Sequence, residues 1–259
     1  MRAIVLAAGQ GTRLRPLTDT MPKCLVELCG VSLLERQADV LRRAGVDDIV
    51  VVGGYRAGMI EARGFTVVRN ERYETTNMVA SLFAAEVCLR GDDDVLIAYG
   101  DIVYEPRVLD AVLACDAATA LAVDLEWRRY WSLRFDDPLR DAETLKIDRR
   151  GCIVELGKKP AGYEEIEAQY MGLILVRRER AAELKAVHDA MDRRARYDGK
   201  DYDNMFMTSF LQHLVDVGWP IRAVPVRGGW LEVDSTDDLA LYHALHERGE
   251  LAAYWNPEA

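Results

Sequence analysis

Long hydrophobic runs and paired cysteines are missing from this sequence, and we expect no leader segment. No apolar run approaches the ~18 residues that a membrane-spanning helix needs. The five cysteines are odd in number and scattered, without C-x-x-C pairs or metal-site spacing, which is typical of reduced thiols. The first residues look like a core strand and not like a signal peptide. We therefore expect a soluble cytoplasmic protein.

Basic residues are outnumbered by acidic residues. The chain has 33 Lys and Arg against 43 Asp and Glu, which gives a net charge of −10. This acidity argues against nucleic acid or an anionic membrane as a partner. It also repels phosphorylated ligands, so a site for such a ligand needs local Arg and Lys groups together with a divalent cation.

Two common phosphate-binding motifs are absent. Nothing at the N-terminus fits the Walker pattern of glycine, four residues, then Gly-Lys-Ser/Thr. The dinucleotide-binding pattern G-x-G-x-x-G requires a third glycine where this chain has Leu14. Both well-known classes of phosphate loop are thereby excluded.

A phosphate-binding turn of another kind is present at the N-terminus. Residues 2–7 are an apolar run rich in β-branched residues, which predicts a strand buried on both faces. The next segment, A-G-Q-G-T-R, has two glycines that let the backbone turn and present N–H groups to an anion. Arg13, Arg15 and Lys23 add three cations. This arrangement predicts a polyphosphate site.

The N-terminal segment carries a specific resemblance. Residues 6–23 follow, without a gap, the signature L-A-A-G-x-G-T-R-L-x-P-L-T-x-x-x-P-K. The chain therefore resembles the nucleotidyltransferases that activate sugar phosphates and related phosphomonoesters. A basic surface loop after a core strand is the alternative, and the length of the match makes it the weaker one. The resemblance implies nucleotide contacts from Leu6, Ala8, Gly9, Gly11, Thr12, Arg13 and Lys23.

The pattern of secondary structure predicts an α/β fold. Strands and helices alternate through the first hundred residues, which predicts a parallel sheet with helices on both faces. The resemblance implies the Rossmann-like, mostly parallel sheet of the nucleotide-diphospho-sugar transferases. We expect a single domain over 1–259, with a nucleotide-binding half (1–123), an acceptor-binding half (124–259) and a small acceptor-side β subdomain.

Hydrophobic periodicity and turn residues define the expected elements. The expected strands are 24–28, 49–52, 65–68, 95–98, 117–124, 145–148, 152–156, 170–176, 221–226 and 230–233. The expected helices are 32–44, 78–89, 180–196, 204–217 and 236–248. Ser32 and Glu35 form a candidate capping box for the first helix.

Two aspartates follow predicted strands and are candidate metal ligands. Asp101 comes after the run 95–98, beside Gly100, and Asp234 ends the last short strand. Ligands of open parallel sheets bind beyond the carboxyl ends of the strands, where two carboxylates can hold Mg²⁺. Read alone, each aspartate equally suits a helix cap or a turn. The resemblance implies that the two share a metal and that Gly100 lies against the nucleotide.

The segment 70–82 indicates which group of nucleotidyltransferases the chain resembles. The Gln-Pro-x-Gly segment of many sugar-phosphate members is absent, and Asn70, Tyr73, Asn77 and Ser81 instead resemble the cytidylyltransferases that act on phosphocholine and similar phosphomonoesters or phosphonates. Asn77 and Ser81 are four residues apart on one helix face, where an amide and a hydroxyl can read a pyrimidine edge. They equally suit a helix cap and a small packing residue.

Candidate acceptor-binding residues come from the second half. The resemblance implies that Lys159, just before a proline, contacts the acceptor phosphate, with Tyr170 and Gly172 nearby. Lys158 replaces the more common acidic neighbour, so the two lysines could exchange roles. A solvated basic turn is the alternative.

An aromatic-rich segment completes the candidate acceptor site. Asp124, Trp127 and Trp131, with Trp230, combine an acid with aromatic faces, which together bind an ammonium by charge and cation–π contact. A lid or a homo-oligomer contact explains the aromatic residues equally well. Arg128 and Arg129 would suit an acidic acceptor, so the acceptor stays open.

The resemblance implies a Mg²⁺-dependent cytidylyltransferase that moves CMP from CTP to a small phosphorylated acceptor such as phosphocholine, in cell-surface polysaccharide biosynthesis. Arg13, Lys23 and Lys159 would be catalytic. The acceptor oxygen is already anionic, so placement and charge neutralisation replace a protein base. The alternatives are a sugar-1-phosphate nucleotidyltransferase using UTP, dTTP or GTP, and a non-catalytic nucleotide-binding regulatory homologue.

Overall fold

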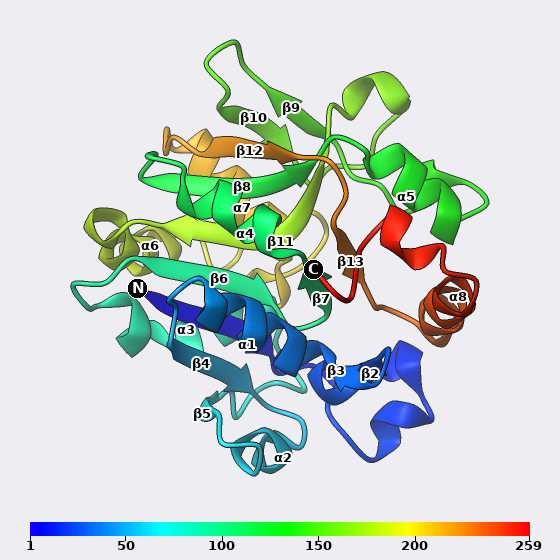
Figure 1. The fold of residues 1–259 in the computed structure, drawn as a ribbon. Helices are drawn as coiled ribbons and strands as arrows, with labels where there is room; N and C mark the ends of the chain where they lie inside the picture. The colour runs from blue at the N-terminus through cyan, green and yellow to red at the C-terminus, as the bar shows by residue number, and fades with distance from the viewer.

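The computed structural model describes residues 1–259 and is built around a seven-stranded sheet (Figure 1). The strand order is β12 (Arg222–Val226), β8 (Thr119–Asp124), β11 (Gln169–Val176), β6 (Val95–Tyr99), β1 (Arg2–Ala7), β4 (Asp48–Gly53) and β5 (Thr66–Arg69). Neighbouring strands are parallel except at β11, which is antiparallel to both β6 and β8. The prediction of an α/β fold with a mostly parallel sheet is therefore confirmed.

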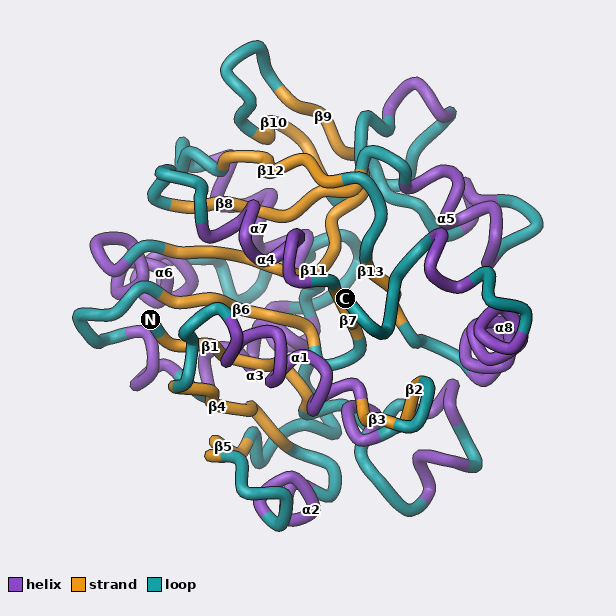
Figure 2. The backbone as a smooth tube through the Cα atoms, viewed as in Figure 1, coloured by secondary structure: helices purple, strands orange, loops and turns teal.

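Helices cover both faces of this sheet, as Figure 2 also shows. The helices are α1 (Leu33–Arg43), α2 (Ala57–Glu61), α3 (Met78–Ala84), α4 (Pro106–Leu113), α5 (Trp127–Arg134), α6 (Arg178–Ala190), α7 (Met207–Asp216) and α8 (Thr236–Glu247). Successive residues of β1 point into opposite layers, Val5 into a core shared with α1, α4, α5 and α8, and Leu6 into a core shared with α3, α6 and α7. Both faces of the strand are buried, which explains its unbroken apolar sequence.

Local sequence sets the ends of several elements. Ser32 caps α1 by accepting a hydrogen bond from the backbone N–H of Glu35 at 3.2 Å. The Glu35 carboxylate reaches back to the Ser32 hydroxyl and not to the backbone, so the expected box is only half formed. The expected hairpin in the second half is confirmed as β9 (Leu145–Ile147) and β10 (Ile153–Leu156), which pair antiparallel.

Other expected elements were wrong in part. Residues 23–25 form a 3₁₀ turn after Pro22 instead of a strand, followed by the short pair β2 (Glu27–Leu28) and β3 (Val31–Ser32). Helix α6 ends at Ala190, before the expected 196, because Asp192 turns the chain by accepting from the N–H of Arg194. Helices α2, α4 and α5 and strand β7 (Ile102–Tyr104) were not expected. No helix in the structure is both long and apolar enough to cross a bilayer.

A small two-stranded ladder brings distant parts of the chain to the edge of the main sheet. Strand β13 (Trp230–Glu232) pairs antiparallel with β7, and the Val233 N–H donates to the Asp101 carbonyl at 2.9 Å. This ladder places Asp234 beside Asp101, although 133 residues separate them in the sequence. The fold thus joins the end of β6 to the end of β13 through backbone hydrogen bonds.

Candidate active site

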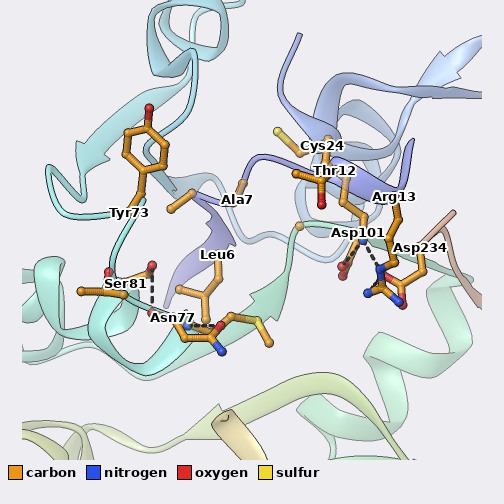
Figure 3. A pocket seen from close by; sticks show the side chains of 17 residues that line it. Leu6, Ala7, Thr12, Arg13, Cys24, Tyr73, Asn77, Ser81, Asp101 and Asp234 are labelled. Carbon is orange, nitrogen blue, oxygen red and sulfur yellow. Dashed lines mark hydrogen bonds and ion pairs between the residues drawn. The ribbon is translucent and has the colours of Figure 1, made fainter. Parts of the chain in front are cut away.

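A cavity of about 300 Å³ opens at the carboxyl ends of β1 and β6 (Figure 3). It is lined by Leu6, Ala7, Ala8, Gly9, Gly11, Thr12, Arg13, Lys23, Cys24, Tyr73, Thr76, Asn77, Met78, Ser81, Gly100, Asp101 and Asp234. This set, which we call the nucleotide cavity, includes every residue that the resemblance implied at the nucleotide or the metal, whereas Arg15 lies outside it and pairs with Asp19 at 3.2 Å. The structure brings those residues together from four separate segments.

Two glycines in the wall of the nucleotide cavity, Gly11 after β1 and Gly100 after β6, are needed for different reasons. Gly11 has φ of 62°, in the left-handed region, and a Cβ there would lie 2.9 Å from the Lys23 Cβ. The Thr18 hydroxyl holds the turn by donating to the Gly11 carbonyl at 2.8 Å. Gly100 allows close approach of two strands, since a Cβ there would lie 2.8 Å from the Leu6 carbonyl oxygen. Larger residues at either place would displace the cavity wall.

Lys23 lies between the two predicted metal ligands. Its Nζ is 2.7 Å from Asp101 Oδ2 and 2.6 Å from Asp234 Oδ1. Arg13 Nη2 is 3.0 Å from the same Asp234 oxygen. Both carboxylates therefore face one point beside the glycine turn, and in Figure 3 they lie opposite Asn77 and Ser81 across the cavity. The cluster combines two cations with two anions in a partly buried position.

Burial and charge act against each other on the ionisable groups of this cluster. Burial disfavours the Lys23 ammonium, but the carboxylates of Asp101 and Asp234 more than offset this and raise the Lys23 pKa above its ordinary value. Burial opposes ionisation of Asp234 too, yet Lys23 and Arg13 lower its pKa. Glu232 differs, because burial, reinforced by Asp234 and Asp101, raises its pKa to about 8 despite Arg134.

The residues present fit a divalent cation. Asp101, Glu232 and Asp234 each offer a carboxylate oxygen, and these oxygens lie within 4.8 Å of one another. Asp101 Oδ1 is buried without a hydrogen-bond partner, so it is free to bind a ligand. Carboxylate oxygens are the donors that hard cations such as Mg²⁺ prefer. Glu232 was not among the residues expected from the sequence, and only its position two residues before Asp234 could have suggested it.

A buried arginine supports the carboxylate cluster. Arg134, on α5, is 1% exposed and ion-pairs with Glu232 at 2.9 Å and with Asp238 at 2.9 Å. Asp238 in turn accepts from the backbone N–H groups of Asp234 and Ser235. This network fixes the backbone that carries Asp234. Nothing in the sequence distinguished Arg134 from its neighbouring arginines.

The candidate base-reading residues already have partners within the protein. The Asn77 amide caps α3, accepting from the Met78 N–H and donating to the Asn204 carbonyl at 3.3 Å. The Ser81 hydroxyl accepts from the Asn70 amide at 3.0 Å and donates to the Asn77 carbonyl. Both side chains line the nucleotide cavity while serving the capping and packing roles that were the alternative reading.

A second cavity of about 470 Å³ adjoins the first and shares Arg13, Asn77, Met78 and Asp234 with it. We call it the acceptor cavity. Four of the residues expected at the acceptor are in its wall, namely Trp131, Tyr170, Gly172 and Trp230. Its other lining residues include several that sequence reasoning missed: Tyr99, Asp141, Glu143, Gln169, Phe206, Thr208 and Glu232. None of these lies in a motif that could have identified it.

Three expected acceptor residues lie outside both cavities. Asp124 is fully buried and accepts from the N–H groups of Glu126 and Gly228 and from Trp230 Nε1, so it ties strand ends together. Trp127 is 4% exposed and packs against Trp131 and Tyr163.

Lys159 is the third. Its ammonium donates to the carbonyls of Leu139 and Arg140, at 2.8 Å for Arg140, and therefore holds the 138–140 turn instead of facing either cavity. The expectation that these three side chains contact the acceptor does not agree with this geometry.

The geometry agrees with comparisons to known proteins. The chain is 40% identical over 250 residues to a CTP:phosphoglutamine cytidylyltransferase of Campylobacter jejuni, covering 92% of this chain and 98% of that relative. The fold matches the inositol-1-phosphate CTP transferase of T. maritima with a TM-score of 0.72 at 22% identity, covering 95% of this chain and 96% of that one. It also matches the CTP:phosphocholine cytidylyltransferase of Streptococcus pneumoniae with a TM-score of 0.68 at 19% identity, covering 95% and 98%.

The family follows from the sequence match itself. Residues 3–198 match the family described as the MobA-like NTP transferase domain, and this range contains the glycine turn, Lys23, Asp101 and most of the acceptor cavity. The prediction of a nucleotidyltransferase is confirmed. The chain belongs to the MobA-like NTP transferase family and is a nucleotidyltransferase.

Proposed function

We propose that this protein is a cytidylyltransferase that transfers CMP from CTP to a small phosphorylated acceptor of the phosphoglutamine type, releasing pyrophosphate. The observation that carries the proposal is the cluster of Lys23, Arg13, Asp101 and Asp234 at the glycine turn, next to a second cavity. The near full-length similarity to a CTP:phosphoglutamine cytidylyltransferase supports the choice of CTP and of the acceptor class.

In this proposal, different residues of the nucleotide cavity bind the triphosphate, the metal and the base. The turn at Gly9 and Gly11 and the cations of Arg13 and Lys23 bind the triphosphate and stabilise the charge that develops on the departing pyrophosphate. Asp101 and Asp234, with Glu232, hold Mg²⁺, which supplies charge neutralisation at the phosphates. Asn77 and Ser81 line the side of the cavity across from this cluster, and the proposal assigns the cytosine to that side.

No protein nucleophile or general base is required. The attacking acceptor oxygen is anionic at neutral pH, so orientation and charge neutralisation carry the reaction. Cys24 is the one thiol in the cavity walls, and burial raises its pKa to about 12, which keeps it protonated. In this proposal residues 1–123 supply the nucleotide-binding half, and residues 124–259 supply most of the acceptor cavity.

A panel of nucleotides and acceptors tests the proposal. Pyrophosphate release is measured with CTP, UTP, dTTP and GTP, each with phosphoglutamine, phosphocholine and glucose 1-phosphate. We expect turnover with CTP and with phosphoglutamine. Preference for UTP or dTTP with glucose 1-phosphate would favour a sugar-phosphate activating enzyme. Binding of CTP by calorimetry without turnover of any acceptor would indicate a regulatory homologue.

A further inference from the structure

The acceptor cavity contains carboxylates that have no cation partner in the protein. Of the acidic residues in its wall, Glu232 pairs with Arg134, and Asp234 pairs with Lys23 and Arg13. Asp141 and Glu143 take part in no ion pair. Both line only the acceptor cavity and not the nucleotide cavity. On the side of the acceptor cavity that is not shared with the nucleotide, these two carboxylates therefore carry negative charge without a salt-bridge partner.

Glu143 is held in place by a buried side chain. Gln169, 4% exposed, accepts from the Glu143 N–H at 3.1 Å and donates to the Glu143 carbonyl at 2.5 Å. The next residue, Thr144, donates from its N–H to the Lys158 carbonyl at 2.8 Å. The backbone of Glu143 is thus fixed on both sides by hydrogen bonds. A fixed backbone lowers the entropy lost when its side chain orders on a ligand.

The groups around Glu143 complete a polar pocket between aromatic walls. Asp141, at the rim, accepts from Trp131 Nε1 at 2.9 Å through one oxygen, and its other oxygen makes no hydrogen bond within the protein. The Tyr170 hydroxyl is buried beside Tyr99 and makes no hydrogen bond of good geometry within the protein. The indoles of Trp131 and Trp230 provide apolar wall. This combination suits a short carbon chain that ends in a hydrogen-bond donor.

The pKa of Glu143 is raised, as expected for a carboxyl group that has no salt-bridge partner. Burial raises its pKa to about 7, and the neighbouring carboxylates of Asp141 and Asp198 add to the shift. A hydrogen bond from Thr208 and the charge of Lys159 oppose it without cancelling it. A carboxyl in these surroundings gains more from a cationic ligand than an exposed one, because water screens it less.

We propose that Glu143, with Asp141 at the rim, binds a primary ammonium group at the end of the acceptor remote from its phosphate. The inference rests on the proposed function and deepens it. Glu143 thereby becomes the residue that selects zwitterionic phosphorylated acceptors over neutral or acidic ones. A primary ammonium offers three N–H donors to carboxylates and to the Tyr170 hydroxyl, whereas a quaternary ammonium offers none.

Two acceptors of equal length test the inference. Phosphoethanolamine ends in an ammonium, and 2-hydroxyethyl phosphate ends in a hydroxyl. Pyrophosphate release with CTP gives kcat/KM for both, for the unmodified protein and for Glu143→Gln, which keeps the shape of the side chain and removes its charge. Phosphocholine serves as the third probe, because it carries the charge without N–H groups.

We expect the unmodified protein to prefer phosphoethanolamine over both other acceptors by about tenfold or more. Glu143→Gln should abolish most of that preference through KM for the acceptor, leaving CTP affinity by calorimetry and the melting temperature unchanged. Glu167→Gln is the matched control, because Glu167 is exposed, lies outside both cavities and makes no ion pair. It should leave the preference intact.

The outcomes separate this inference from the proposed function. Equal losses for both acceptors in Glu143→Gln, or turnover restricted to the neutral acceptor, would overturn the role of Glu143 while leaving the cytidylyltransferase in place. A preference for phosphocholine would show that the pocket reads charge and apolar bulk instead of N–H groups. Absence of turnover with CTP and every acceptor, phosphoglutamine included, would remove the proposed function and this inference together.

Discussion

The two cavities of this protein differ in whether their charged side chains form ion pairs within the protein. In the nucleotide cavity, Lys23 and Arg13 contact Asp101 and Asp234 at 2.6 to 3.0 Å, so the charges are balanced within the protein. In the acceptor cavity, Asp141 and Glu143 have no cationic partner. A balanced cluster keeps its geometry without a ligand, whereas an unbalanced one is completed by the ligand. We therefore expect substitutions in the first cavity to affect turnover and those in the second to affect acceptor affinity.

The largest expected effect tests the nucleotide side of this comparison. Asp101→Asn should lower kcat by about a thousandfold or more, because it removes a carboxylate from the metal-binding set. The fold should persist, since the Asp101 backbone keeps its hydrogen bond from Val233. Pyrophosphate release and the melting temperature are the measurements. Asp116→Asn, at an exposed position without side-chain partners, is the control, and near-normal activity of Asp101→Asn would refute the metal assignment.

Lys23→Met should have the second largest effect. We expect kcat to fall by about a hundredfold to a thousandfold, because a cation that stabilises the leaving pyrophosphate is lost. The ligand-free protein should also lose about 3 kcal/mol of stability, since two poorly exposed carboxylates lose their shared partner. Denaturant unfolding and steady-state kinetics check the two parts. A fall in kcat without any loss of stability would mean that the ion pairs contribute nothing to the resting state.

A pH-dependent prediction concerns the core behind the nucleotide cavity. His188 is 6% exposed, its ring stacks on Phe83 of α3, and its Nδ1 lies 2.9 Å from the Tyr202 hydroxyl. Burial lowers its pKa to about 4. The unfolded chain then binds more protons than the folded one between pH 6.5 and 4, so stability falls as the pH drops through this window.

The matched variant for this prediction is His188→Phe, which keeps the stacking and cannot titrate. Its stability relative to the unmodified protein should improve by about 2 kcal/mol between pH 7 and pH 4.5. Denaturant unfolding at a series of pH values measures the difference. A constant difference across the range would mean that His188 titrates normally.

The smallest expected effect tests whether Lys159 acts on the acceptor directly or by positioning. Its contacts to the 138–140 turn predict that Lys159→Met raises the acceptor KM about two- to fivefold, by loosening the segment that carries Glu143. Lys158→Met, one residue away and exposed, should change little. The loss should not add to that of Glu143→Gln. If the effects of Lys159→Met and Glu143→Gln add fully and Lys159→Met also lowers kcat, then Lys159 contacts the acceptor phosphate directly, as the family resemblance implied.

The two cavities also differ in how far the sequence could predict them. The nucleotide cavity was predictable because one contiguous segment supplies the turn and its cations, and because Asp101 and Asp234 each follow a strand. The main sheet delivers Asp101 at the carboxyl end of β6, and the antiparallel β7–β13 ladder brings Asp234 beside it. The expected α/β fold followed from the same alternation of strands and helices.

The acceptor cavity was predicted only in part. Trp131 and Trp230 were found by composition, but Asp124, from the same stretch as Trp131, satisfies buried backbone N–H groups instead. Glu143 lies in no motif, and its importance depends on Gln169, 26 residues away. Helix α5 was overlooked because an aromatic-rich stretch suggested a surface, whereas tertiary packing buries Trp127, Tyr130 and Trp131. Long-range contacts of this kind leave no local pattern.

The position of Lys23 has a thermodynamic consequence. Its ammonium is the internal counter-ion of Asp101 and Asp234, so a triphosphate that draws Lys23 toward itself leaves both carboxylates uncompensated. Their affinity for any other positive charge must then rise. By thermodynamic reciprocity, a cation bound by these two carboxylates raises the affinity for the triphosphate by the same factor. Cooperativity between anion and cation is thereby built into a single side chain.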